Sequence, residues 1–258
     1  MSRLVVFGLG YTASRIADPL RGRGWEVDAT GSAGNLDFGD ESAVREAIGR
    51  ATHILSSVPP ADGDDIVLDR YADALGQRWL GYLSSTGVYG DAGGAWVDES
   101  APTGRGRRTA RAECDARWMD RGARVFRLPG IYGPGRSALD RVRDGKAHRI
   151  DLPGQVFSRV HVEDIVAGVV AAVERDAAPG AYNLSDDLPT SQNAVIEEAC
   201  HLLGVKLPPL QTVEEAGLSQ AARGFYSENR RVANGKAKRV LGWRPRYPTY
   251  REGLAALV

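Results

Sequence analysis

The sequence predicts an α/β fold, in which a doubly wound parallel sheet carries a smaller C-terminal lobe. Three observations indicate it. Short apolar runs alternate with amphipathic segments through the first half of the chain, as is typical of parallel strands joined by helical crossovers. A glycine-rich turn follows the first apolar run, and small or hydroxyl-bearing residues follow later ones. A chain of 258 residues is long enough for one large domain with an appendage.

The expected elements follow in a regular order. The first helix ends at Gly24, and Pro59-Pro60 stops the third strand. Proline- and glycine-rich connections interrupt the second half, which also contains two longer helices. Strands are expected at 3–8, 25–31, 52–57, 79–85 and 124–128, and helices at 11–23, 41–50, 65–77, 107–121, 162–175 and 191–203. We assign residues 1–130 to the sheet core, with 156–185 returning to it, and residues 131–155 and 186–258 to the lobe.

Residues 3–17 have the pattern of a buried strand, a glycine-rich turn and the start of a helix. Gly8 permits the tight turn, Gly10 lets a diphosphate approach the backbone, and Ala13 lets the helix pack on the strand. A helix N-terminus in this setting presents its N–H groups to a pyrophosphate. The stretch therefore predicts a Rossmann-type dinucleotide site. The alternative is a tight strand–helix turn with no ligand.

Four segments follow the predicted strands directly, at residues 8–10, 57–59, 85–87 and 129–131. In open parallel sheets, ligands bind beyond the carboxyl ends of the strands. We therefore expect all four segments to line one crevice.

The composition argues against several classes of protein. The 33 basic residues balance 33 acidic ones, so no nucleic-acid or acidic-membrane partner is expected. No apolar run approaches the length that spans a bilayer. Cys114, Cys200 and the four histidines lack metal-site spacing, so no metal is expected. A cleaved leader would destroy the glycine turn, and a cytoplasmic location is the expectation.

Several phrases occur in a characteristic order, at residues 84–90, 127–135, 157–165, 182–184 and 234–243. In this order and spacing, the chain resembles the extended short-chain dehydrogenase/reductases, which include sugar-nucleotide epimerases and dehydratases. Within that group it is similar to an atypical bacterial subgroup of NAD(P)-dependent oxidoreductases. The subgroup shares Pro59-Pro60, residues 94–99 and residues 225–229.

The resemblance implies where the cofactor and the reacting groups lie. It assigns the catalytic Ser/Thr to Ser85, four residues before Tyr89. Ser32 stands just past the second strand, and Asp37 and Phe38 fall where related folds contact adenine. The remaining cofactor residues are Gly8, Gly10, Tyr11, Thr12 and Ala13 at the turn, Ser57 and Val58 alongside, and Ile131 and Tyr132 at the nicotinamide end.

One part of the family pattern is missing. The family's Tyr-x-x-x-Lys pair exchanges a proton with the substrate, because a phenol with a pKa near ~10 needs a neighbouring cation to act near neutrality. Arg105 and Thr109 occupy these positions, and no tyrosine lies between Tyr89 and Tyr132. Three explanations stay open: another group takes the proton role, the chain binds cofactor without turnover, or a weaker donor such as water suffices. Arg105 or Arg108 could supply the missing positive charge.

We therefore expect an NAD(P)-dependent oxidoreductase or epimerase/dehydratase-like enzyme that transfers hydride to or from a small carbonyl or sugar-nucleotide substrate. Ser85, Tyr89 and Tyr132 are its candidate catalytic residues. The alternative is a catalytically silent redox sensor that binds the dinucleotide. NADP is favoured over NAD, because no carboxylate directly past the second strand would repel a 2′-phosphate. The resemblance also suggests a homodimer.

Overall fold

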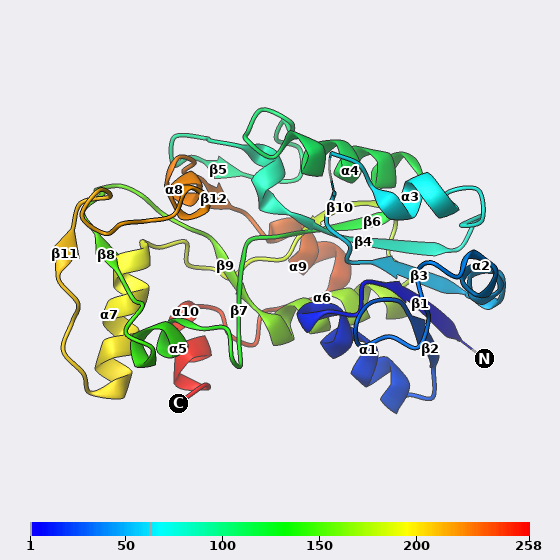
Figure 1. The fold of residues 1–258 in the computed structure, drawn as a ribbon, viewed down its shortest axis with the longest axis horizontal. Helices are drawn as coiled ribbons and strands as arrows, with labels where there is room; N and C mark the ends of the chain where they lie inside the picture. Colours follow the sequence, from blue (N-terminus) through cyan, green and yellow to red (C-terminus); the bar gives the residue numbers. More distant parts are fainter. Residues whose placement is uncertain (1, 62) are drawn as a thin grey trace.

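The computed structural model describes residues 2–61 and 63–258, with backbone alone at 221 and 222. Within these residues, six strands form a parallel sheet (Figure 1). Their spatial order is β10 (Gly180–Asn183), β6 (Arg124–Leu128), β4 (Trp79–Ser85), β3 (His53–Ser56), β1 (Arg3–Phe7) and β2 (Glu26–Ala29). Strand β2 pairs with one edge of β1, and β3, which follows β2 in the sequence, pairs with the other edge. The strand order therefore reverses at β1 and β3, which is where open α/β sheets bind ligands.

Helices cover both faces of the sheet (Figure 1). One face carries α1 (Tyr11–Gly22) and α6 (Val162–Glu174), and the other carries α2 (Glu41–Arg50), α3 (Ile66–Tyr71) and α4 (Thr109–Asp120). The alternation of side chains along β1 supplies both layers. Leu4 and Val6 enter the core beneath α1 and α6, whereas Val5 and Phe7 enter the core beneath the other three helices.

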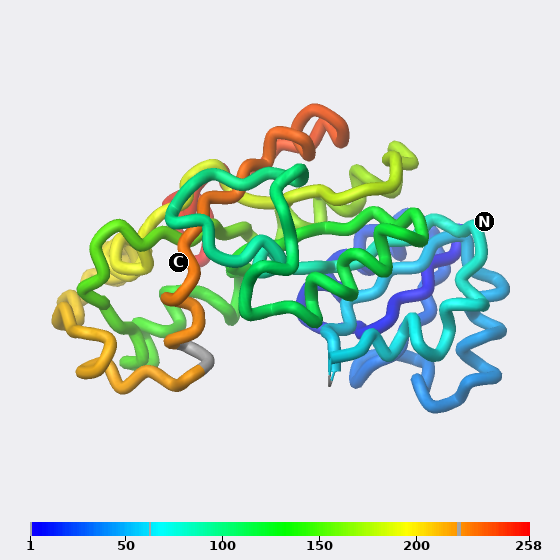
Figure 2. The backbone as a smooth tube through the Cα atoms, turned by 90° about the horizontal axis from the view of Figure 1, so that it is seen from above, coloured from blue at the N-terminus to red at the C-terminus, as the bar shows by residue number. Residues whose placement is uncertain are grey.

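A smaller lobe lies at the end of the molecule opposite the N-terminus (Figure 2). Its core joins Leu139, Ile196, Cys200 and Leu254. Its helices are α5 (Ala138–Arg143), α7 (Gln192–Leu203) and α10 (Tyr250–Ala255), beside the short pair β8 (Arg149–Ile150) and β11 (Leu210–Gln211). Between sheet and lobe lie the pairs β5 (Trp96–Val97) with β12 (Arg231–Val232) and β7 (Gly130–Tyr132) with β9 (Arg159–His161), and the helix α8 (Gln220–Tyr226). The helix α9 (Gly235–Leu241) packs against α6 and β10 of the sheet layer.

The predicted fold class, a doubly wound parallel sheet of Rossmann type, is confirmed. The elements predicted for the first half lie within two residues of their predicted bounds, with one exception. The helix predicted at 65–77 ends at Tyr71, and the chain then turns through Gly76, whose φ is +58°. The second strand is four residues long, because the chain leaves the sheet after Ala29. Residues 162–183 supply α6 and β10 to the sheet layer, whereas β9 pairs with β7 outside the sheet. The domain boundaries stay a prediction.

No helix in the described parts of the chain combines the length and apolarity that crossing a membrane requires.

Candidate functional site

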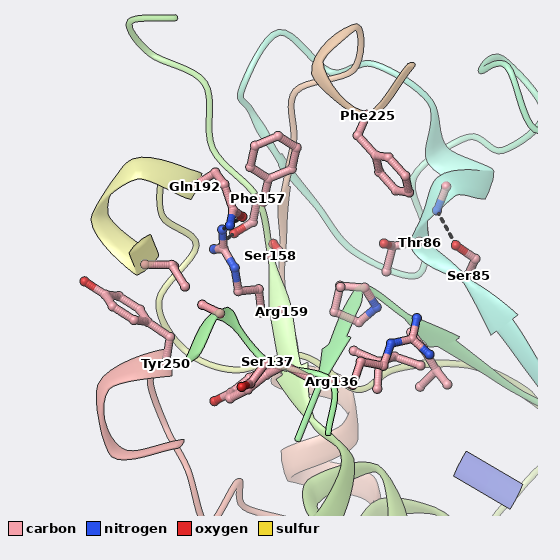
Figure 3. A pocket seen from close by; sticks show the side chains of 18 of the residues that line it. Ser85, Thr86, Arg136, Ser137, Phe157, Ser158, Arg159, Gln192, Phe225 and Tyr250 are labelled. Atoms are coloured by element: carbon pink, nitrogen blue, oxygen red, sulfur yellow. Dashed lines mark hydrogen bonds between the residues drawn. The ribbon is translucent and has the colours of Figure 1, made fainter. Parts of the chain in front are cut away.

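A cavity of about 920 Å³ opens between the carboxyl edge of the sheet and the lobe. Gly10, Ser57, residues 85–87 and residues 129–131 line it, so each of the four segments that follow the predicted strands contributes to one crevice. Phe157, Arg159 and Gln192 form part of the facing wall, with Tyr250 from α10 (Figure 3). The cavity therefore occupies the point where the strand order reverses.

The glycine turn is clamped by the strands beside it. Gly8 has a φ of +83°, a conformation that side-chain-bearing residues rarely adopt. A Cβ on Gly8 would lie 3.1 Å from both Ser57 Oγ and Val58 Cγ2. The Gly8 N–H donates to Thr30 Oγ1 at 3.2 Å, and the Ser57 hydroxyl donates to the Gly8 carbonyl. These contacts fix the backbone of the turn.

Gly10 differs from Gly8, because it faces open space. It is the N-cap of α1, its backbone is extended, and no atom lies within 4 Å of the position a Cβ would take. No side chain caps α1, and its first turn has no acidic residue. Tyr11, Thr12 and Ala13 of this turn line the cavity. An uncapped helix N-terminus behind an open glycine fits the pyrophosphate of a dinucleotide.

The residues predicted for the adenine end lie outside the described cavity lining. Ser32 and Asp37 are exposed, and Asp37 Oδ1 accepts the Gly39 N–H at 2.8 Å. Phe38 packs edge-on against Phe7 and Tyr71. Their contacts with adenine, like those of Val58 beside the cofactor, stay predictions.

Two hydroxyls reach the cavity from the end of β4. Ser85 Oγ accepts the Gly87 N–H at 3.1 Å and so caps the 3₁₀ turn η1 (Thr86–Tyr89). The side chain of Thr86 points into the cavity beside it (Figure 3). Among the described residues, neither hydroxyl donates its proton to an acceptor. Both can therefore donate to an oxygen of a bound molecule. The sequence argument named Ser85 and missed Thr86, although Thr86 follows it directly.

The structure does not bring Tyr89 to the cavity. Its hydroxyl donates to Asn183 Oδ1 at 2.8 Å and accepts from Arg127 Nη1 at 3.0 Å. Arg127 in turn pairs with the buried Asp115 at 2.7 Å. Tyr89 is 4% exposed, and burial raises the pKa of its phenol. The prediction that Tyr89 is a proton donor is therefore corrected: its hydroxyl belongs to a buried polar network behind the strands.

The ring of Tyr132 lines the cavity, but its hydroxyl points elsewhere. The hydroxyl donates to the Thr249 carbonyl at 3.5 Å, and a Cβ on Gly253 would overlap it. Burial raises the pKa of this phenol far above its ordinary value. Tyr132 and Ile131 can shape the pocket, but the predicted proton role does not suit Tyr132.

The region of the missing Tyr-x-x-x-Lys pair is rich in arginine. Arg105 and Thr109, at the family positions, are exposed and lie outside the described lining, whereas Arg107, Arg108 and Arg111 line the cavity. Arg111 donates to the Tyr82 hydroxyl at 2.9 Å. The spacing of the family motif alone therefore could not identify which arginine faces the cavity.

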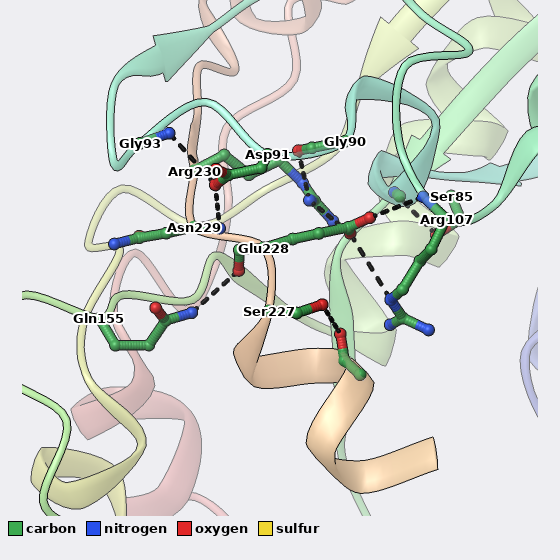
Figure 4. A network of polar contacts seen from close by, with 12 residues as sticks. Ser85, Gly90, Asp91, Gly93, Arg107, Gln155, Ser227, Glu228, Asn229 and Arg230 are labelled. Atoms are coloured by element: carbon green, nitrogen blue, oxygen red, sulfur yellow. Dashed lines mark hydrogen bonds and ion pairs between the residues drawn. The ribbon is translucent and has the colours of Figure 1, made fainter. Parts of the chain in front are cut away.

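Hydrogen bonds connect residues 225–229 (the 225–229 segment) to the arginine-rich start of α4 and to loops near the lobe (Figure 4). Glu228 accepts the Arg107 N–H at 3.1 Å and Arg230 Nη1 at 2.9 Å. Asn229 donates its backbone N–H to Asp91 at 2.7 Å and its side-chain amide to Gly154 at 3.0 Å. The segment thus fixes three loops that are far apart in the sequence.

No group of three His, Cys, Asp or Glu residues in the described ranges could hold a metal ion.

Comparison with known proteins supports this description. No family model matches the chain. A conserved protein of unknown function from Silicibacter pomeroyi has a solved structure that is 40% identical, with a TM-score of 0.86 over 100% of this chain and 98% of that one. The dTDP-glucose 4,6-dehydratase of Bacillus anthracis, solved with NAD, is 15% identical, with a TM-score of 0.79 over 100% of this chain and 95% of that one. A human epimerase family protein, solved with NADPH, is 15% identical, with a TM-score of 0.77 over 99% of this chain and 98% of that one.

One curated relative also matches. A Streptomyces protein named 3-diazoavenalumate denitrifying reductase is 34% identical over 141 residues, which is 50% of this chain and 45% of that protein. The chain thus spans less than half of that relative's length. The dehydratase and epimerase structures share the fold that the resemblance to the extended short-chain dehydrogenase/reductases implies, and a named reductase also matches part of the chain.

Proposed function

We propose that this chain, which belongs to one family with the conserved Silicibacter pomeroyi protein of unknown function, is an NAD(P)-dependent reductase of a small molecule. The observation that carries the proposal is the cavity itself. It joins an open, uncapped helix N-terminus at Gly10 to two hydroxyls without a hydrogen-bond acceptor in the described chain, those of Ser85 and Thr86.

The glycine-turn end supports dinucleotide binding. Gly10, Tyr11, Thr12 and Ala13 would hold the pyrophosphate by their backbone, and Ile131 would pack beside the nicotinamide. When bound, a reduced nicotinamide would supply a hydride to the carbonyl carbon of a substrate, and the π electron pair of the C=O bond would move to the oxygen. Structural neighbours were solved with NAD or with NADPH. Because Ser32 and its neighbours provide no carboxylate directly past β2, NADP remains our preferred cofactor.

Reduction suits this site better than epimerisation or dehydration. Those two reactions begin by removing a proton from a substrate hydroxyl, which requires a base of suitable pKa at the reacting carbon. The hydroxyls of Tyr89 and Tyr132 bond to protein groups away from the cavity. Tyr11, Tyr226 and Tyr250 do line it, but its described lining contains no lysine that could complete a tyrosine–lysine pair. A reduction instead needs a donor to the oxygen that gains charge. Ser85 and Thr86 can donate hydrogen bonds to that oxygen, and water can then protonate it.

The name of the curated relative also favours a reduction. It describes a reductase that removes nitrogen from a diazo compound. When a hydride replaces dinitrogen on carbon, the leaving N₂ takes the bonding electron pair and no proton is needed. Such a reaction makes no demand on a tyrosine–lysine pair. We therefore include aryl diazonium compounds beside carbonyl compounds and sugar nucleotides as candidate substrates.

The proposal is tested in two steps. Fluorescence titration with NADPH and NADH measures cofactor binding, and absorbance of the reduced nicotinamide then follows single turnovers with the three substrate classes. We expect NADPH to bind and at least one class to oxidise it. Ser85→Ala should slow that oxidation about 100-fold, whereas the matched control Ser227→Ala, outside the described lining, should not.

The outcomes separate the alternatives. Failure of the folded protein to bind either dinucleotide refutes the proposal. Binding without oxidation by any class would support the silent sensor instead. A homodimer and a cytoplasmic location stay predictions, as does the substrate.

A further inference from the structure

Arg108 is a cation in the cavity wall without a hydrogen-bonding or ion-pair partner among the described residues. Its side chain is half-buried and lines the cavity at the start of α4. Within the described ranges, its guanidinium forms neither a hydrogen bond nor an ion pair. A guanidinium carries five N–H donors and stays charged at any physiological pH. Leaving such a group partly desolvated and unpaired is unfavourable, so the site favours an added acceptor.

Arg108 lies beside the hydroxyl of Ser85. The side chain crosses Gly87, where an added Cβ would lie 2.6 Å from Arg108 Cδ and 3.3 Å from its Nε. The same point lies 3.3 Å from Ser85 Oγ. The missing side chain at residue 87 thus lets the arginine reach the loop that carries Ser85.

The surrounding charges favour an anion. Burial, followed by the like charges of Arg107 and Arg111, lowers the pKa of Arg108, and Arg230 acts in the same direction. Glu228 is the opposing charge, but its two oxygens already accept from the Arg107 N–H and from Arg230. No carboxylate is therefore left over for Arg108 among these neighbours.

Two contacts hold Arg108 for this task. Its guanidinium carbon lies 5.6 Å from the centre of the Phe225 ring, which suits a cation–π contact. Glu228 fixes the backbone at Arg107, one residue earlier. Both contacts come from the 225–229 segment, and Figure 4 shows the one from Glu228 to Arg107. Arg111 and Arg127, by contrast, are bound to Tyr82 and Asp115.

We propose that Arg108 binds an oxyanion of the substrate, a carboxylate or a phosphate, beside the carbon that reacts next to Ser85. The inference rests on the proposed function and narrows it to acidic substrates. It makes Arg108 a specificity-determining residue at the place of the missing tyrosine–lysine pair. The planar guanidinium suits two parallel hydrogen bonds to either oxyanion.

The experiment uses the full chain saturated with NADPH, so that the pyrophosphate site is filled. Calorimetry measures binding of benzoate, phenyl phosphate and the neutral benzamide to the wild type, Arg108→Gln and the matched control Arg105→Gln. Thermal unfolding with acetate or phosphate, against chloride at equal ionic strength, gives a second readout for the same proteins.

We expect benzoate or phenyl phosphate to bind the wild type and Arg105→Gln, and to bind Arg108→Gln about tenfold more weakly or worse. Whichever of the two binds more tightly identifies the oxyanion. Benzamide affinity and the NADPH dissociation constant should change less than about twofold. Acetate or phosphate should raise the unfolding temperature of the wild type and of Arg105→Gln, but not of Arg108→Gln.

An oxyanion response in Arg108→Gln equal to that of the wild type would overturn the inference. So would the absence of any response in the wild type, or a loss of NADPH affinity in Arg108→Gln, which would assign Arg108 to the cofactor. If NADPH binds none of the proteins, the proposed function fails. The unfolding measurements with small oxyanions still test Arg108 in that case.

Discussion

The two ends of the cavity are built differently. The glycine-turn end is made by consecutive residues of β1, the turn and α1, and it presents backbone groups to the cavity. The arginine end is made by side chains from β4, the start of α4 and the 225–229 segment, which are distant in the sequence. The glycine-turn end suits a pyrophosphate, a group that many different cofactors share. The second end can change by substitution without disturbing the first.

Under the proposed function, the two ends separate cofactor binding from substrate choice. Backbone N–H groups at a helix N-terminus bind phosphate whatever side chains surround them. Side chains such as Arg108 and Ser85 instead depend on contacts that several loops must hold together. Substitutions at the two ends should therefore have separable effects on stability and binding.

The largest expected effect is at the glycine turn. Gly10→Val should weaken NADPH binding about a thousandfold, or about 4 kcal/mol, because its side chain would enter the open space above α1. Stability should hardly change, since Gly10 has an extended backbone that any residue can adopt. Fluorescence titration and urea unfolding measure the two quantities.

The matched control is Gly8→Ala. Its positive φ and its close approach to Ser57 and Val58 should destabilise the fold by about 1–2 kcal/mol. Retention of NADPH binding by Gly10→Val would break the comparison, because the turn would then not face the ligand.

The next effect is a pH dependence on the lobe side of the sheet. His161 caps α6 through its Nδ1, and its Nε2 is buried without a partner in the described chain. Burial, and then the charges of Arg246 and Arg15, lower its pKa from 6.5 to about 4. Above pH 6.5 the histidine is neutral in both states. Between pH 6.5 and 4 the unfolded chain takes up a proton that the folded chain does not, so stability falls with falling pH.

The loss should reach about 3 kcal/mol at most for this group. Urea unfolding from pH 7 to pH 4 measures it against His161→Asn, which keeps a good helix cap and cannot titrate in this range. The variant should show a flatter pH profile than the wild type. Parallel profiles would mean that other groups cause the acid sensitivity.

The sequence predicts the backbone geometry of the glycine turn well and the arginine end poorly. The turn can be predicted because Gly8, Gly10 and Ala13 act through local backbone geometry at fixed spacing. Tyr89 was misjudged because its distance from Ser85 along the chain does not reveal that η1 turns its hydroxyl inward to Arg127. Arg108 could not be separated from its neighbouring arginines, because its contacts with Gly87 and Phe225 depend on tertiary packing.

The smallest expected effect concerns Tyr89, and it tests whether the Tyr89 hydroxyl supports the fold and takes no part in proton transfer. Tyr89→Phe removes a buried hydroxyl that joins Asn183 to Arg127, so it should lower the free energy of unfolding by about 2 kcal/mol. Oxidation of bound NADPH by an active substrate should change less than about threefold, because the hydroxyl does not reach the cavity. Tyr132→Phe should cost less stability, since its hydroxyl makes a single long hydrogen bond of 3.5 Å.

The turnover and stability of Tyr89→Phe are compared with those of Ser85→Ala. A large loss of turnover in Tyr89→Phe, with unfolding unchanged, would restore the phenol as the proton donor and require the η1 turn to rearrange on binding. A stability loss with turnover retained would instead assign Tyr89 to the support behind the strands. Catalysis would then depend on Ser85 and Thr86, whose hydroxyls reach the cavity. The arginine end would thus differ from the family in its chemistry as well as in its residues.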